Sequence, residues 1–189
     1  MFRFSFGPFY PEHRAGNRLV SLTGGSPTAS QSADDRDGKR VVRYDRSGQT
    51  AHFVGEWYEF NVTTGIAPAY DPFNGRPIAM KRGSTLSYLH HDHLGSLVAA
   101  TDPSGNELGN GSWARYSPFG QLSLGAGLPS DRLFTGQTRD NVLGAGNAGN
   151  DAYYFFQARY YHATIGQFQS ADVVAPNPRR PRMATPPPA

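Results

Sequence analysis

No cysteine occurs in the chain of 189 residues. Disulfide scaffolds, thiolate metal sites and cysteine nucleophiles are therefore excluded. Long apolar runs are missing as well, because the longest, Ala152 to Phe156, falls far short of the roughly 20 residues that a membrane helix needs. The first eight residues lack the apolar stretch of about 7–15 residues that marks a signal peptide, so no leader is expected at this end.

Lysine is almost as rare as cysteine, since 16 of the 18 basic residues are arginine. Arginine suits paired and stacked side chains better than a solvated lysine surface does. The net charge of +3 comes from Arg179, Arg180 and Arg182, and residues 1–178 hold 15 bases and 15 acids. A neutral body gives little support to nucleic-acid binding, which favours a basic face.

Glycine and proline are abundant instead, with 22 and 15 residues, whereas apolar residues make up only 38% of the chain. This composition is typical of many turns and short strands rather than of helices. Tyrosine and phenylalanine supply 22 of the 24 aromatic residues, which again favours strands. The length predicts one domain with a substantial core.

The densest aromatic stretch, residues 153–172, places seven aromatic side chains around Arg159. Tyr153 to Phe156 is typical of a strand buried on both faces, and Gln167 to Gln169 alternate as a second strand after a turn at Gly166. Arg159 is expected to stack on rings while its guanidinium bonds carboxylates or carbonyls. The stretch predicts a structural hairpin, with a small-ligand site as the alternative. Five of its side chains should be more buried than Trp or Tyr elsewhere: Tyr154, Phe156, Arg159, Tyr161 and Phe168.

Short strand-like runs separated by glycine-bearing turns fill the middle of the chain. Turn units begin at Tyr44, Tyr70, Thr101 and Tyr116, each with a glycine four or five residues later, and the spacing of these units is irregular. Such an order predicts an antiparallel meander, with one short helix allowed at Ser130 to Thr138. The strands are expected at Lys39–Tyr44, Gln49–Val54, Glu56–Val62, Ile78–Met80, Leu86–Leu89, Leu94–Thr101 and Ser112–Tyr116.

Several short motifs, in one order along the chain, resemble RHS-repeat (YD-repeat) proteins and their RHS repeat-associated core domain. The resemblance covers about residues 37–178, and His162 and Gln167 stand where the family usually has Asp and Arg. A Gly-x-x-Tyr-Glu at residues 55–59 also resembles the family. The main motif residues are Tyr88, Asp92, His93, Leu94, Gly95 and Ser96; Tyr116, Pro118, Phe119 and Gly120; Phe134 and Gly136; Ala158, Arg159, Tyr160 and Tyr161; Gly166 and Phe168; and Asp172.

The resemblance implies an all-β fold, an antiparallel meander of short strands as in the end of an RHS β-shell, with disordered ends. In complete members the strands spiral into a hollow shell that encloses a C-terminal toxin. We expect a partly disordered N-terminal segment (1–36), a core domain (37–175) and a disordered Pro/Arg-rich tail (176–189). The family pattern stops at Arg179, so the chain resembles a C-terminally truncated fragment. An unpaired strand edge near residues 37–44 would then favour self-association.

Residues 90–93 are the sole cluster with metal-ligand residue types, and in a strand His91 and His93 would share a face. Two ligands do not make a site, and no cysteine can complete it. A turn that leads into Leu94 is therefore the preferred interpretation, and we expect no metal and no cofactor.

Catalytic motifs are also missing from the sequence. There is no Gly-x-Ser-x-Gly elbow and no phosphate-binding glycine loop. Toxin-bearing family members cut themselves after the core, and the resemblance implies that this needs an Asp-Pro-x-Gly-Leu motif. The chain has no such motif: Asp102 lies upstream and its Gly105 is followed by Asn106, while Asp172 is followed by Val173. We expect no self-cleavage and no enzymatic activity.

The preferred hypothesis is therefore a non-enzymatic structural module of an RHS-type shell, from a toxin-encapsulating or cell-surface protein. A carbohydrate- or receptor-binding β module is the first alternative, and the remnant of a self-processing aspartyl autoprotease is the second. Glycan binding would need Trp57 and Trp113 exposed in a groove, whereas a shell would pack both between strands. The expected partners are other shell parts or a second copy of the chain. The family suggests secretion or the cell surface.

Overall fold

The computed structural model describes residues 10–14, 18–23, 30–35, 39–44, 48–109, 111–124, 127–140, 153–157 and 159–170. These residues form an all-β fold of short antiparallel strands, which confirms the predicted class. Within them no helix is long and apolar enough to span a membrane. The tail 176–189, Ala158 and Asp172 lie outside the described residues.

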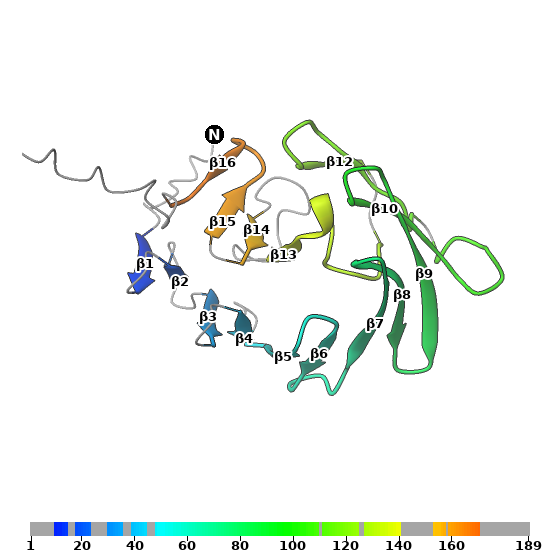
Figure 1. The fold of residues 1–189 in the computed structure, drawn as a ribbon, viewed down its shortest axis with the longest axis horizontal. Coiled ribbons are helices and arrows are strands. Elements are labelled where there is room, and N and C mark those ends of the chain that lie inside the picture. Colours follow the sequence, from blue (N-terminus) through cyan, green and yellow to red (C-terminus); the bar gives the residue numbers. More distant parts are fainter. Residues whose placement is uncertain are drawn as a thin grey trace, which may run out of the picture.

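Ten strands form one large sheet, here called the wall sheet, in which each strand pairs with its neighbours in sequence. Figure 1 shows these strands following one another around an arc. Because every connection joins neighbouring antiparallel strands, tight turns suffice to link them. The strands are β1 (Tyr10–Arg14), β2 (Arg18–Thr23), β3 (Ser30–Asp34), β4 (Arg40–Tyr44), β5 (Thr50–Val54), β6 (Tyr58–Asn61), β7 (Pro68–Phe73), β8 (Arg76–Arg82), β9 (Thr85–His91) and β10 (Leu97–Thr101).

The wall sheet begins earlier in the chain than the sequence predicts. Strand β4 pairs with β3 on one side and with β5 on the other, so the expectation of an unpaired edge near residues 37–44 is wrong. The N-terminal segment 1–36 contributes β1, β2 and β3 to the sheet. Among the described strands, β1 and β10 are the outermost members of this sheet.

Four further strands form a second sheet, here called the inner sheet: β13 (Thr138–Asp140), β14 (Tyr153–Phe156), β15 (Arg159–His162) and β16 (Gln167–Phe168). It lies on the concave side of the arc (Figure 1). The hairpin predicted from the aromatic stretch is present, since Tyr154 pairs with Tyr161 and Tyr161 with Phe168. A small sheet joins β11 (Arg115–Tyr116) to β12 (Leu122–Leu124), and a short 3-10 turn, η1 (Phe134–Gly136), occupies the predicted helical site.

Strand β7 was not predicted, because its two prolines and the glycine that follows favour a turn. The prolines remove two backbone donors, and a bulge between Asp71 and Pro72 accommodates the loss. The predicted turn occurs one step later, at Asn74 and Gly75, which both have positive φ. The predicted strand that begins at Leu94 starts instead at Leu97, because residues 92–95 form a turn.

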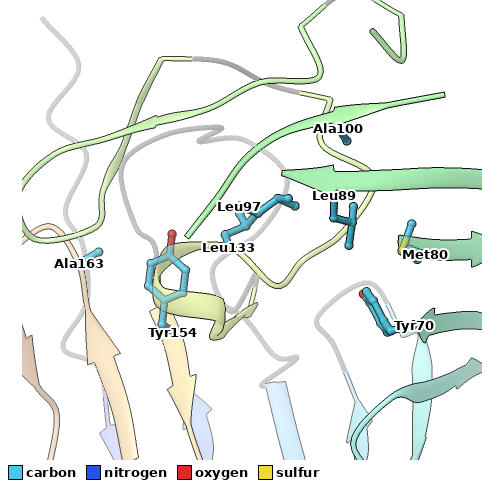
Figure 2. Packing of buried hydrophobic residues seen from close by; sticks show 8 residues of the cluster. All are labelled: Tyr70, Met80, Leu89, Leu97, Ala100, Leu133, Tyr154 and Ala163. Atoms are coloured by element: carbon cyan, nitrogen blue, oxygen red, sulfur yellow. The ribbon is translucent and has the colours of Figure 1, made fainter. Parts of the chain in front are cut away.

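The core lies between the concave face of the wall sheet and the inner sheet. Figure 2 shows its buried side chains in a row, from Ala163 and Tyr154 through Leu133 and Leu97 to Leu89, Met80 and Tyr70. Leu97, Ala100 and Tyr154 are completely buried. Leu133 belongs to residues 127–140, here called the inner segment, which carries the chain from the small sheet to the inner sheet. The core thus depends on contacts between elements far apart in sequence.

The expected burial of the aromatic stretch is only partly correct. Tyr154 is fully buried, but Phe168 is 39% exposed, and Tyr161 and Phe156 are half-buried. Tyr160 and Tyr70 are each 6% exposed, so they are more buried than most of the named set. The reason is position: β16 is the last strand of the inner sheet, so its side chains have a neighbouring strand on one side only in the described structure.

Candidate functional site

The turn at Asp92 is built by its carboxylate. Asp92 Oδ1 accepts hydrogen bonds from the backbone N–H groups of Leu94 and Ser96, at 2.9 and 2.8 Å. Gly95 takes a φ of 88°, a value that few other residues tolerate. Ser96 is then buried, and its Oγ accepts a hydrogen bond from Thr135 N in the next motif. The motif residues at 92–96 thereby shape one end of β10 and hold η1.

Several of the other motif residues meet at the same place, here called the motif junction. Tyrosine hydroxyls tie it together: Tyr116 donates to Leu97 O, Tyr154 to Gly120 O, and Tyr161 to Phe119 O. Gly120 has a φ of 88°, and a Cβ there would lie 2.3 Å from the Phe134 ring. A Cβ at Gly166 would lie 2.9 Å from the Phe119 ring. Each glycine is therefore required by a ring from another motif as well as by its own turn.

Some predicted motif residues do not enter the junction. Tyr88 and Leu94 are 43% and 55% exposed, and Pro118 is exposed as well. Arg159 is half-buried, with its guanidinium carbon 3.9 Å from the Phe168 ring centroid. Its expected ring stacking is thus present at the outer strand of the inner sheet.

The histidine cluster is divided between a strand and a turn. Strand β9 ends at His91, and His93 lies in the following turn, so the two histidines do not share a strand face. His91 is partly buried, and its Nε2 has no hydrogen-bond partner. Burial first, and then Arg76, lower its pKa. In the described part of the chain no three His, Asp, Glu or Cys side chains are arranged to hold a metal ion.

The buried ion cluster that joins the two sheets is centred on Arg40, a residue that the sequence did not single out. Arg40 in β4 forms a two-pronged pair with Asp140 in β13, at 3.0 and 2.6 Å. Its guanidinium also donates to the Tyr160 hydroxyl and stacks 3.6 Å from the Phe155 ring centroid. Tyr160 in turn donates to Asp140 Oδ2. The role expected of Arg159, tying layers through rings and a carboxylate, is performed by Arg40.

Arg43 extends this cluster along the wall sheet. Its Nη1 donates to Asp140 Oδ1 at 2.9 Å and to Asp131 Oδ2 at 3.2 Å. Burial alone would raise the pKa of Asp140, but Arg40 and Arg43 hold it lowered, at about 2. Asp140 is therefore ionised at neutral pH, and its side-chain hydrogen bonds join β13 to β4 and to β15.

The inner segment is fixed to the wall sheet at several further points. Arg82 donates to Pro129 O at 2.8 Å, and the hydroxyls of Tyr70 and Ser130 are 2.9 Å apart. Arg132 donates to Glu56 O, and its guanidinium carbon lies 5.3 Å from the Trp57 ring and 4.9 Å from the Tyr70 ring. These contacts hold the segment against β6–β8.

Between the inner segment and the wall sheet lies a cavity of about 400 Å³. Its floor is formed by side chains of β5–β8, and Asp131 and Asp140 lie on its other side. Three arginines and three acids line it together with amides and apolar side chains: Arg43, Gln49, Ala51, Glu59, Asn61, Thr64, Ile66, Pro68, Tyr70, Arg82, Asp131, Arg139 and Asp140.

Glu59 is the unusual group in this cavity. It is 5% exposed, and its Oε1 accepts no hydrogen bond, although Arg132 Nη2 lies 3.7 Å away. Burial and, next, the nearby Asp131 carboxylate raise the pKa of Glu59 to about 8, against the opposing effect of Arg132 and Arg43. Buried acceptors are nearly always satisfied in folded proteins, so this one marks a place where a donor is missing.

Sequence reasoning missed both Arg40 and Glu59. Arg40 opens a strand next to Val41, and Glu59 alternates with Tyr58 and Phe60, so each sits at a position where a side chain can face inward. The alternation of Tyr58, Glu59 and Phe60 in the sequence would place the two aromatic residues inward, whereas the structure buries Glu59 and exposes both rings, so the sequence gives no signal for it. Its partners, 70 or more residues away, carry no local signal.

Comparison with known proteins gives a match at the level of fold. No family model matches the chain, and neither does any curated protein. A crystal structure of TcdB2-TccC3 matches with a TM-score of 0.67, 17% identity and 87% of this chain covered. A TcdB2-TccC3 structure without the hypervariable C-terminal region gives a TM-score of 0.64, 17% identity and 85% coverage. A Tc holotoxin pore of Photorhabdus luminescens, with a mutation in TccC3, gives 0.65, 17% and 85%.

The chain spans only 8–9% of the length of these matched chains. The likeness fits the all-β fold that the motif resemblance implies, and it covers 87% of the chain.

Proposed function

We propose that the chain is a non-enzymatic structural module of an RHS-type shell. The observation that carries the proposal is the sequential arc of β1 to β10, whose concave face is held to the inner sheet by Arg40. The aligned TcdB2-TccC3 structures support a wall of this kind, and each of them is an assembly of more than one component. The partners of the chain would decide whether it belongs to a toxin-encapsulating shell or to a cell-surface protein.

The chemistry of the buried groups supports a structural role. Asp140 is saturated by Arg40, Arg43 and Tyr160, and its lowered pKa makes it a poor proton donor. The motif residues at the junction use their hydroxyls and glycines for contacts between segments. Hydrogen bonds and close packing of this kind fix the positions of strands rather than of reacting atoms.

The two alternatives have less support. Trp113 is 38% exposed beside Arg115, as a glycan-binding residue would be, but Trp57 packs under Arg132 against the core, and neither tryptophan lines the cavity. An aspartyl autoprotease needs two carboxylates that share a proton. The Asp131 carboxylate raises the pKa of Glu59, so these two are the acids to test if self-cleavage is found.

Association tests the proposal. In the described structure β1 pairs only with β2, so its other edge offers unpaired backbone groups. We expect the purified full chain to self-associate through this edge, measured by size-exclusion chromatography with light scattering over a concentration series. Hydrogen exchange should then show protection of residues 10–14 that increases with concentration, while β5, paired on both sides, serves as the internal control.

Two results would count against the proposal. A sharp monomer peak at all concentrations, with unchanged exchange in β1, would mean that the module closes its own sheet. A defined cleavage product after incubation without added protease, seen by intact-mass measurement, would contradict the non-enzymatic role. The Glu59→Gln and Asp131→Asn variants would then show whether these acids cause the cut.

A further inference from the structure

We propose that the cavity between the wall sheet and the inner segment binds an alkyl ammonium or alkyl guanidinium group, which Glu59 and Asp131 receive. The site is separate from the motif junction and from the proposed role in a shell. It is inferred from the cavity and from the hydrogen-bonding state of the groups that line it.

Glu59 Oε1 is the unmet acceptor in this cavity, whereas the unmet atoms of the nearby arginines are the Nε donors of Arg132 and Arg139. Glu59 Oε1 is buried without a hydrogen bond, and Asp131 accepts a side-chain hydrogen bond only at Oδ2 among the described contacts. A buried carboxyl without a donor costs free energy that a charged donor would recover. A buried carboxyl oxygen without a donor, beside the part-exposed carboxylate of Asp131, suits a cation with several N–H groups.

None of the nearby arginines donates to Glu59 Oε1. Arg43 is shared by Asp131 and Asp140, and Arg132 donates to Glu56 O while it stacks on Trp57 and Tyr70. Arg132 remains 3.7 Å from Glu59 Oε1, too far for a hydrogen bond. The groups that affect the charge of Glu59 are Asp131, Arg132, Arg43 and Asp140.

The remaining lining fits an alkyl stem. Ala51, Ile66 and Pro68 provide apolar walls, and the Tyr70 ring lies beside them in the same cavity. Long cationic side chains bury their methylene groups along such surfaces while the charged head reaches a polar partner. A volume of about 400 Å³ lies within the range of small-molecule sites and can hold a stem with its charged end.

Calorimetric titration of the full chain with n-butylamine and n-propylguanidine tests the proposal, with n-butanol and butyrate as uncharged and anionic probes of similar size. We expect both cations to bind at one site per chain and at least about tenfold more tightly than butanol. Butanol lacks the charge, so its complex loses a charged hydrogen bond in a buried site. Binding of butyrate as tight as that of the amine, or no binding of either cation, would overturn the proposal.

Two variants and one control localise the site. Glu59→Gln keeps the shape of the side chain and should lower the affinity for the cations by about tenfold or more. Asp131→Asn should lower this affinity less, because Asp131 is already paired with Arg43. Glu107→Gln, an exposed glutamate outside the cavity, should leave binding unchanged. Equal binding to Glu59→Gln and the unaltered chain would contradict the assignment even if the cations bind.

The pH dependence separates a cation from an anion. A cation stabilises ionised Glu59, so its binding should strengthen as the pH rises through about 8 and should release a proton at pH 7, measured by calorimetry in buffers of different ionisation enthalpy. An anion would bind more tightly at lower pH and take up a proton. The opposite trend would therefore exclude the proposed ligand class.

The same chemistry occurs within the chain, at Arg179, Arg180 and Arg182. Replacing these three by alanine in the full chain distinguishes an external ligand from an internal one. Equal binding of propylguanidine to both chains indicates an external ligand, and tighter binding to the triple variant indicates competition by these arginines. Failure of both chains to bind would overturn the proposal.

Discussion

Asp140 and Glu59 are two carboxyl groups that line one cavity and are almost equally buried, yet their proton affinities shift in opposite directions. Asp140 receives hydrogen bonds from Arg40, Arg43 and Tyr160, and its pKa falls to about 2. Glu59 receives no hydrogen bond at Oε1, and its pKa rises to about 8. Burial penalises both anions, so the number of donors decides the outcome. One end of the cavity is therefore a completed structural joint, and the other is an incomplete site.

Breaking the completed joint should have the largest effect. Arg40→Ala removes both prongs of the pair with Asp140, the hydrogen bond to the Tyr160 hydroxyl and the stacking on Phe155. Removal of one partner from a buried pair costs about 3–5 kcal/mol of unfolding free energy. Denaturant unfolding followed by tyrosine fluorescence measures it. The double variant Arg40→Met with Asp140→Leu should recover part of this loss, because it removes both charges of the pair but also takes Asp140 away from Arg43 and Tyr160. If the two variants were equally unstable, the loss would come from packing rather than from the weakened pairing of the acid.

Replacing Glu59 at the incomplete site should raise the unfolding free energy instead of lowering it. Folded Glu59 holds its proton up to about pH 8, whereas the unfolded residue loses it near its ordinary value of 4.5. The folded state thus binds more protons between these values, and the stability falls as the pH rises through this window. Glu59→Gln should remove that slope and raise the unfolding free energy at pH 8 by about 1–3 kcal/mol. A parallel pH–stability curve for the variant and the unaltered chain would show that Glu59 is solvated.

The acid limb of the stability curve should belong to Asp140. Its folded pKa is lowered from 3.8 to about 2, so its contribution is present above pH 3.8 and is lost as the pH falls toward 2. The expected loss is about 1–2 kcal/mol, discounted for incomplete protonation at the lowest usable pH. Melting temperatures between pH 2 and 5 measure it, with Asp131→Asn, at a more exposed acid, as the control. An acid limb that persists unchanged in Asp140→Asn would assign it to other carboxyls.

Arg159 should give the smallest effect and so test whether arginines in this fold differ by position. The sequence predicts a loss of about 2–4 kcal/mol for Arg159→Ala if its partners are left unpaired in a semi-buried layer. The structure places it half-buried, stacked on Phe168, which is 39% exposed. Because solvent reaches this contact, we expect a loss of about 1 kcal/mol. A loss of unfolding free energy equal to that of Arg40→Ala would show that Arg159 stabilises the inner sheet as much as Arg40 does.

Local physics made much of the fold predictable. Glycines with positive φ at residues 48, 75, 105 and 120 lie where the turn units place them. The alternating runs became strands with bounds close to those expected, as in Thr50–Val54 and Tyr153–Phe156. Where the strand prediction failed, an unusual backbone explains it: β7 tolerates one proline at its first residue and another at a bulge.

The sequence by itself therefore determined the all-β class, the turns and the aromatic hairpin, because each depends on residues within about one strand of each other. Only the tertiary structure decided which arginine ties the sheets together. Arg40 and Asp140 lie 100 residues apart, and no local pattern distinguishes Arg40 from Arg43 or Arg159. The shifted pKa of Glu59 likewise arises only when the inner segment covers β6, because desolvation and the field of Asp131 depend on distance in space.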